Sequence, residues 1–187
     1  MNIAVFSDTH GNCEDMRSAI VDKGPFDMLF HLGDGIDDGQ IIAEEFSLPF
    51  HGVYGNEDYP YFNTMPERLC VKVYSWNFLL SHGHQLDINP YHAKDKWEKN
   101  LKEMARLAKL KKADVFLFGH THAALIEKLN GVVICNPGDQ YISPNSMPTF
   151  AIISAAQHRL EIKILKKTRH DGWEKFLEFE FKKYSFG

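Results

Sequence analysis

The front half of the chain alternates short apolar runs with segments that have the spacing of amphipathic helices. Three of these runs are too short for helices and predict buried strands: residues 3–6, 27–32 and 50–54. Residues 13–23 and 40–46 between them are expected to be helical, with Asn12 as the N-cap of the first helix. Apolar strands joined by helices are typical of parallel strands that are covered on both faces.

The second half begins with a predicted hairpin at residues 68–80 and continues with a long helix. The helix is expected over residues 90–111, with Asn89 as its N-cap and Pro90 in its first position. A short buried strand is expected at residues 115–118. Four further apolar runs predict one antiparallel meander: residues 125–129, 132–135, 149–154 and 160–165. The whole pattern predicts an α/β fold with two β-sheet halves and helices on the outside.

The C-terminal segment has a strand pattern of its own. Leu177, Phe179 and Phe181 alternate with charged residues, so one face of the predicted strand is apolar. We therefore divide the chain into a main domain at residues 1–167 and an aromatic-rich extension at residues 168–187, which is expected to add an edge strand. The alternative is that this extension pairs with a second copy of the chain in a homo-oligomer.

Composition narrows the class of protein. A length of 187 residues fits one domain, and an apolar fraction of 44% suffices for a packed core. The net charge of -4 argues against general nucleic-acid binding, which usually shows as a basic excess. The three cysteines are far apart in the sequence and predict reduced thiols in a cytoplasmic protein. No apolar stretch approaches the ~20 residues that a membrane helix needs, so no membrane partner is expected.

Polar side chains that can hold metal ions follow five of the predicted strands. The motifs are Asp8-Thr9-His10, Gly33-Asp34, Gly55-Asn56, Ser81-His82-Gly83-His84 and Gly119-His120-Thr121-His122. Ligands collect at the carboxyl ends of strands in open α/β sheets, so these segments are expected to meet. The candidate metal ligands are Asp8, His10, Asp34, Asn56, His82, His120 and His122. Seven ligands are too many for one ion and fit two.

The ligand types indicate the class of metal. Mixed imidazole and carboxylate ligands favour transition metals over Ca²⁺ and Mg²⁺, which prefer oxygen. We expect two divalent ions, with manganese as the first choice and nickel, iron, zinc or cobalt as alternatives. Asp8 and Asp34 offset only two of the four positive charges, so the centre stays positive even with a bridging hydroxide. A positive centre suits a phosphate ester, whose transition state spreads negative charge over its oxygens.

The order of these motifs resembles the calcineurin-like metallophosphoesterase family, and more narrowly its small single-domain bacterial and archaeal phosphodiesterases. The resemblance covers roughly residues 1–155 and implies a four-layer α/β/β/α sandwich of two mixed β-sheets with flanking helices. It implies that Asp8, His10, Asp34 and His122 hold the first ion. The second ion would be held by Asp34 (bridging), Asn56, His82 and His120. A hydroxide between the ions would attack phosphorus directly, without a covalent enzyme intermediate.

The sequence departs from the family pattern at two positions. Glu57 stands where larger relatives have a histidine that protonates the leaving group and where the small branch commonly has cysteine. The candidate catalytic residues are therefore Asn56, Glu57 and His84, with His84 or Glu57 as the proton donor. Asp139 follows the familiar Asn-Pro-Gly turn in place of the usual serine, which puts the family's contacts in this loop in question.

Several other polar residues have two interpretations. His31 lies inside a strand and is expected to be a core histidine rather than a ligand. Cys13, near a helix start, has either a lowered pKa or the properties of a buried structural thiol. Asp58 is a candidate to orient one of the metal-binding histidines.

These observations predict a binuclear metal-dependent phosphodiesterase that acts on a small phosphorylated substrate. A phosphomonoesterase is the alternative within the same chemistry. A non-catalytic scaffold is the alternative outside it, because the retromer scaffold subunit resembles this family. That subunit has lost part of the metal set, whereas all seven positions are present here.

Overall fold

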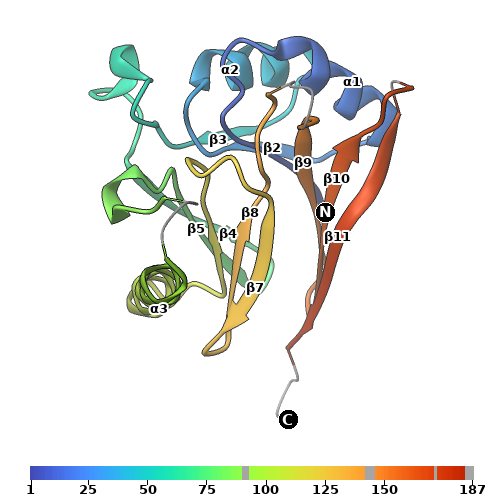
Figure 1. Cartoon of the computed structure of the whole chain (residues 1–187). Coiled ribbons are helices and arrows are strands. Elements are labelled where there is room, and N and C mark those ends of the chain that lie inside the picture. The colour runs from blue at the N-terminus through green and yellow to red at the C-terminus, as the bar shows by residue number, and fades with distance from the viewer. Residues whose placement is uncertain (90–92, 142–145, 171, 184–187) are drawn as a thin grey trace.

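Residues 1–89, 93–141, 146–170 and 172–183 are described by a computed structural model, in which two mixed β-sheets lie between helices (Figure 1). One sheet has six strands in the order β11-β10-β9-β1-β2-β3. Its strands are β1 (Asn2–Phe6), β2 (Met28–His31), β3 (Phe50–Gly52), β9 (Thr149–Ala155), β10 (Arg159–Lys167) and β11 (Trp173–Lys182). β1, β2 and β3 are parallel, and the other three strands extend the sheet from β1 in antiparallel pairs.

The second sheet has five strands in the order β4-β5-β6-β8-β7. They are β4 (Arg68–Val73), β5 (Trp76–Ser81), β6 (Val115–Leu117), β7 (Leu125–Leu129) and β8 (Val132–Asn136). β4 and β5 form the predicted hairpin, while β5, β6 and β8 run parallel to one another. Both sheets are therefore mixed, as predicted.

Helices cover the outer face of each sheet. α1 (Cys13–Lys23) and α2 (Ile36–Glu45) pack on the first sheet, and α3 (Lys94–Leu110) packs on the second. Two short 3₁₀ turns, η1 (Tyr59–Tyr61) and η2 (His84–Leu86), follow β3 and β5. This arrangement is the four-layer α/β/β/α sandwich that the family resemblance implies, and that expectation is confirmed.

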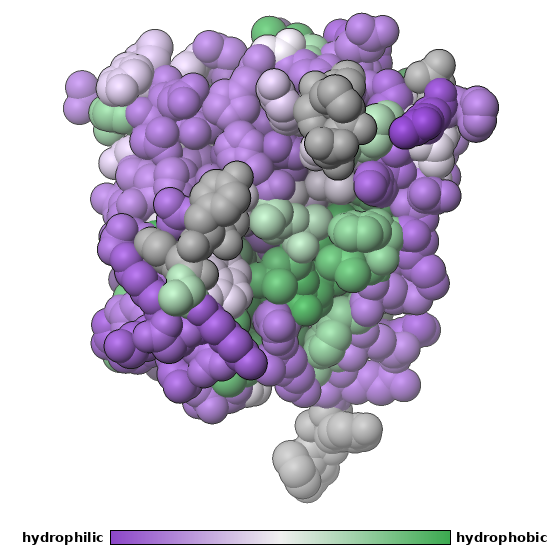
Figure 2. All heavy atoms as spheres, viewed as in Figure 1, coloured by the Kyte–Doolittle hydropathy of each residue, from purple (hydrophilic) through white to green (hydrophobic). Residues whose placement is uncertain are grey.

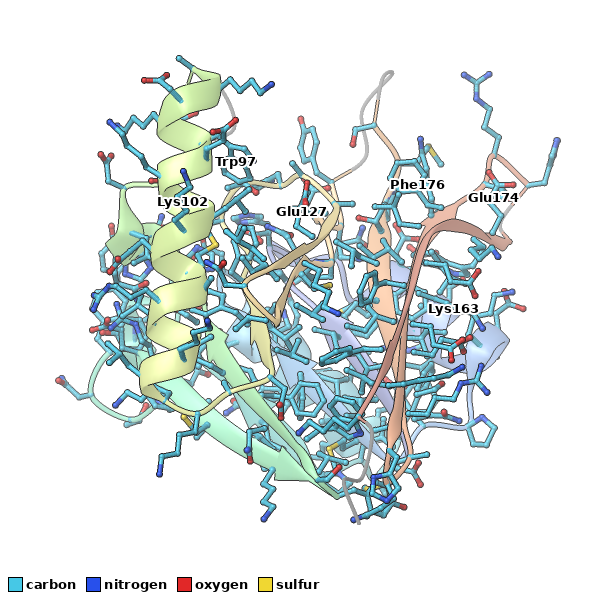
Figure 3. All side chains as sticks on the ribbon, turned by 90° about the horizontal axis from the view of Figure 1, so that it is seen from below. Trp97, Lys102, Glu127, Lys163, Glu174 and Phe176 are labelled. Atoms are coloured by element: carbon cyan, nitrogen blue, oxygen red, sulfur yellow. The ribbon has the colours of Figure 1, made fainter. Side chains whose placement is uncertain are left out.

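Alternation along the strands builds three apolar layers. In β1, Ile3 and Val5 point into the core between the sheets, whereas Ala4 and Phe6 point to α1 and α2. Alternation along the strands of the second sheet likewise builds the core under α3, where Phe116 of β6 and Met104 of the helix belong to one apolar cluster. Trp97 of α3 also lies on the side of the helix that faces the sheet (Figure 3). Strands that are buried on both faces explain the continuous apolar runs in the sequence.

Three local predictions were wrong. α2 begins at Ile36 rather than at residue 40. α3 begins at Lys94 with Ala93 in the N-cap position, so Asn89 is not its N-cap, and Pro90 lies outside the described residues. The four late apolar runs do not form one meander: β7 and β8 belong to the second sheet, whereas β9 and β10 belong to the first. Hairpin pairing is local, but the choice of sheet depends on contacts with distant strands.

β11 forms the outer edge of the first sheet, antiparallel to β10. Leu177, Phe179 and Phe181 on its inner face are partly buried against the core between the sheets. Figure 2 shows apolar side chains gathered on this side of the molecule, between β7 and β11. The division of the chain at residue 167 and the homo-oligomer both stay predictions. Within the described residues, no helix is long and apolar enough to cross a membrane.

Candidate metal centre

The predicted ligands meet where the parallel strands of both sheets end. Asp8, Asp34 and Asn56 follow β1, β2 and β3, while His82 and the pair His120/His122 follow β5 and β6. Five of the seven have a positive φ, which is uncommon outside glycine. The five are Asp8, His10, Asp34, His120 and His122. Such backbone strain clusters at functional sites, where the surrounding structure holds it in place.

The histidine and carboxylate ligands form two groups that match the predicted division. Asp8, His10 and His122 present ligand atoms within 4.8 Å of one another, and so do Asp34, His82 and His120. A third group joins His10, Asp34 and Glu57 at the same limit. Asp34 therefore belongs to a group on either side, as a residue that bridges two ions must. That these residues bind metal stays a prediction.

Asp8, the carboxylate of the first group, is fully buried. Its Oδ2 accepts hydrogen bonds from Ser7 Oγ at 2.5 Å and from the His120 backbone N–H at 3.0 Å. Its Oδ1 is buried and accepts no hydrogen bond, and it lies 3.3 Å from His122 Nε2. An unpaired buried carboxylate oxygen is costly, so this atom fits a bound cation.

In the second group, His82 likewise has a ligand atom that faces acceptor atoms. Its Nδ1–H donates to the Leu32 carbonyl at 2.8 Å, since a carbonyl can only accept. The other nitrogen, Nε2, faces Asn56 Oδ1 at 3.2 Å and Asp34 Oδ2 at 3.3 Å. Three electron-rich atoms thus converge, and they need either a proton or a cation between them. The donors present fit a divalent transition metal.

Asp139 is a part of the site that the sequence did not reveal. Its carboxylate Oδ2 lies 2.7 Å from His122 Nδ1, although the residue stands in a loop after β8. The only sequence signal was the replacement of a serine in the family's turn. Spacing could not have found the contact, because the loop reaches His122 from another strand.

Asp58 holds the loops of the site together rather than orienting a histidine. Its carboxylate accepts four backbone N–H groups, from Asp34 at 2.7 Å, Gly35 at 2.9 Å, Ile36 at 3.1 Å and Gly55 at 2.7 Å. Gly35 is the N-cap of α2 and offers no side chain, so Asp58 caps that helix from the loop after β3. It thereby ties the segment of Asp34 to the segment that leads to Asn56.

Burial and neighbouring charge set the protonation of the ligands. Burial raises the pKa of Asp8 above its ordinary value. Burial also lowers the pKa of His82, but the contact with Asp34 and the charge of Asp8 outweigh it and leave that pKa raised. Burial and the nearby His82 lower the pKa of His120 to about 4. His120 is therefore neutral at neutral pH, as a metal ligand must be.

His31 and Cys13, each with two interpretations from the sequence, can now be placed. His31 is fully buried, accepts from the Gly33 N–H and faces Thr9 Oγ1, which makes it a core histidine. Burial and a hydrogen bond to Asp38 raise the pKa of Cys13 to about 11, opposite to the lowered pKa considered above.

The two proton-donor candidates differ in setting. His84 lies with its ring 5.3 Å from that of His82, and its buried Nδ1 has no hydrogen-bond partner among the described residues. Glu57 is 62% exposed, and its carboxylate is 3.4 Å from His10 Nδ1.

Two hollows open beside the ligands. One has a volume of about 590 Å³ and extends from His120 and His122 to Ile88 and Asn89. The other, about 210 Å³, lies over Asp8 and His10. Tyr141 lines both, and no lysine or arginine lines either of them among the described residues.

Comparison with known proteins gives three findings. The sequence matches the calcineurin-like phosphoesterase superfamily domain over residues 1–158. A probable metallophosphoesterase of Mycoplasma pneumoniae is 29% identical over 160 residues, which span 84% of this chain and 92% of that protein. A phosphodiesterase of Methanocaldococcus jannaschii is 25% identical over 170 residues, or 82% of this chain and 92% of that protein.

A solved structure shares the fold. Vps29 from Entamoeba histolytica, in complex with zinc, superposes with a TM-score of 0.74 over 97% of this chain and 100% of that one. The two sequences are 20% identical, so this likeness concerns the fold alone.

Proposed function

The chain belongs to the calcineurin-like phosphoesterase superfamily, and we propose that within it the protein is a phosphodiesterase that depends on two divalent transition-metal ions. Its substrate would be a small phosphorylated molecule. Manganese is the first choice for both ions, and the location of the protein would be the cytoplasm. The observation that supports the proposal is the convergence of ligand atoms in two groups, with Asp34 of the second group also within 4.8 Å of His10 from the first. Asp8 Oδ1 and His82 Nε2 both face acceptors that only a proton or a cation can satisfy.

The residues present fit two ions. Asp8, His10 and His122 would hold one, and Asn56, His82 and His120 the other, with Asp34 shared. When bound, the ions supply an activated water and positive charge for the phosphate oxygens. The protein supplies rigid positions. Five of the seven ligands have a strained backbone, and Ser7, Asp58 and the Leu32 carbonyl hold Asp8, the Asp34 segment and His82 in place.

Charge favours a diester over a monoester. Asp8 and Asp34 offset two of the four positive charges of two divalent ions, and Glu57 and Asp139 add two carboxylates close by. No lysine or arginine lines the two hollows among the described residues. A phosphodiester brings one negative charge to this centre, whereas a monoester dianion brings two and would find less compensation.

We assign the protonation of the leaving group to His84. Its Nδ1 is buried and unpaired, and its ring lies beside those of His82 and His120. Glu57 is the alternative, on the opposite side near His10. His84→Ala should slow substrates with a poor leaving group far more than those with a good one. Equal loss on both would instead favour Glu57 or a binding role.

The proposal is tested on purified protein after treatment with a chelator. Added Mn²⁺ should restore hydrolysis of bis(p-nitrophenyl) phosphate in preference to p-nitrophenyl phosphate. His120→Ala should lose this activity. The matched control is His158→Ala, which removes an exposed histidine outside the candidate ligand groups and should keep the activity. Activity on the monoester alone would support the phosphomonoesterase instead.

A scaffold protein of the same fold is the remaining candidate. The aromatic edge strand β11 favours it, because another chain can pair with an edge strand. Absence of bound metal in the purified protein, together with unchanged properties of His120→Ala, would support the scaffold and overturn the phosphodiesterase.

A further inference from the structure

His122 and His82 occupy equivalent roles in the two ligand groups but are held differently. The His82 side chain is fully buried and its Nδ1–H donates to a neutral carbonyl, that of Leu32. The His122 side chain is 42% exposed, so packing alone does not fix its ring. Its Nδ1 lies 2.7 Å from the Asp139 carboxylate, and its Nε2 lies 3.3 Å from Asp8 Oδ1.

Asp139 is itself firmly held. It is 5% exposed, and its backbone carbonyl accepts the Thr149 N–H at 2.8 Å. The residue before it, Gly138, donates its N–H to the Asn136 side chain at 2.8 Å. On the other side, the Gln140 N–H donates to the Asp8 carbonyl at 3.4 Å. The carboxylate therefore reaches His122 from a loop that is tied to the segment of Asp8.

We propose that Asp139 is a positioning residue for His122, and that it makes the ion site of Asp8, His10 and His122 the tighter of the two. The inference rests on the proposed function, because it requires that His122 bind metal. By accepting the Nδ1–H, the carboxylate leaves the lone pair of Nε2 directed at Asp8. A carboxylate behind a metal-binding imidazole fixes its tautomer and strengthens it as a donor. The carbonyl behind His82 fixes the tautomer but has no full charge.

The test compares three variants by isothermal titration of the metal-free protein with MnCl₂. Asp139→Ala should weaken one of two binding events by about 10- to 100-fold and leave the other unchanged. Asp139→Asn keeps an acceptor oxygen without the charge and should lose less. Glu174→Gln removes an exposed carboxylate on β11, at the edge of the molecule, and should change neither event (Figure 3).

Nitrogen NMR of the metal-free protein gives a readout that does not depend on metal. His122 should carry its proton on Nδ1 in the wild type and in Asp139→Asn, and should become a mixture of tautomers in Asp139→Ala. Wild-type affinity of both sites in Asp139→Ala would overturn the role of Asp139 alone. Equal weakening of both sites with a lower melting temperature would also overturn it, in favour of a general structural role. If the wild type bound no metal, this inference and the proposed function would fail together.

Discussion

Asp58→Ala is expected to destabilise the protein more than almost any other change of a single polar side chain. The Asp58 carboxylate accepts four backbone N–H groups, all between 2.7 and 3.1 Å, and the residue is 6% exposed. Alanine would leave these donors unpaired in a place that water reaches poorly. The donors belong to the turn after β2, the start of α2 and the loop after β3.

The magnitude follows from the number of bonds. A hydrogen bond to a charged group contributes about 1.5–3 kcal/mol, but four on one carboxylate are not additive, since the loops can relax and admit some water. We expect a loss of about 3–5 kcal/mol in the free energy of unfolding, near the upper end for a single substitution. For a protein of about this size each kcal/mol shifts Tm by roughly 2–4 °C, so Tm should fall by roughly 6–20 °C.

The assay is urea unfolding in the presence of EDTA, which removes any stabilisation by bound metal. Asp22→Ala on the exposed face of α1 is the matched control and should change stability by no more than about 0.5 kcal/mol. Asp58→Asn should lie between them, because one amide oxygen can accept from only one pair of donors. A loss below about 1 kcal/mol for Asp58→Ala would refute the interpretation of Asp58 as the clamp of these loops.

Four further predictions follow from single features. A Cβ at Gly119 would collide with Ser7 Oγ, so Gly119→Ala should displace the hydrogen bond to Asp8 and reduce bound manganese measured by elemental analysis. Burial lowers the pKa of His31 to about 4, so the unfolded chain binds more protons than the folded one between about pH 6.5 and 4. The free energy of unfolding should therefore fall as pH drops through this window. Urea titration at several pH values should show a shallower fall for His31→Gln. Iodoacetamide at pH 8 should modify the exposed Cys70 well before Cys135, whose pKa burial raises to about 12; equal rates by mass spectrometry would contradict this. If the β11 edge pairs with a second copy, light scattering should give the mass of two chains, and a monomer at every concentration would refute the homo-oligomer.

That the candidate ligands lie close together was predictable, because each of them follows a strand along the chain. Short apolar runs locate the strands, and the carboxyl ends of parallel strands meet at one edge of a sheet, so residues such as Asp34 and His82 could be brought together without a structure. The resemblance to the calcineurin-like phosphoesterases is confirmed by the match over residues 1–158. Helix starts were less predictable. The α2 start is capped from another loop by Asp58, and within the helix the acidic pair Asp37 and Asp38 in the first turn is its sequence signal.

The wrong prediction of a single meander and the failure to predict the contact of Asp139 with His122 have the same cause. Between β8 and β9 the chain passes from the second sheet to the first, and Asp139 stands in that crossing. Along the crossing, the Gln140 carbonyl accepts from the Asn12 side chain at 2.8 Å, which fixes the loop beside the segment of His10. If β7 to β10 formed one sheet, as the sequence predicts, this loop would be an ordinary turn at the edge of that sheet. Once the chain changes sheets, the loop must pass over the carboxyl ends of the strands, and a carboxylate in it lies within reach of His122. The aspartate that stands in place of the family's serine therefore contacts His122 from the loop in which the two sheets are joined.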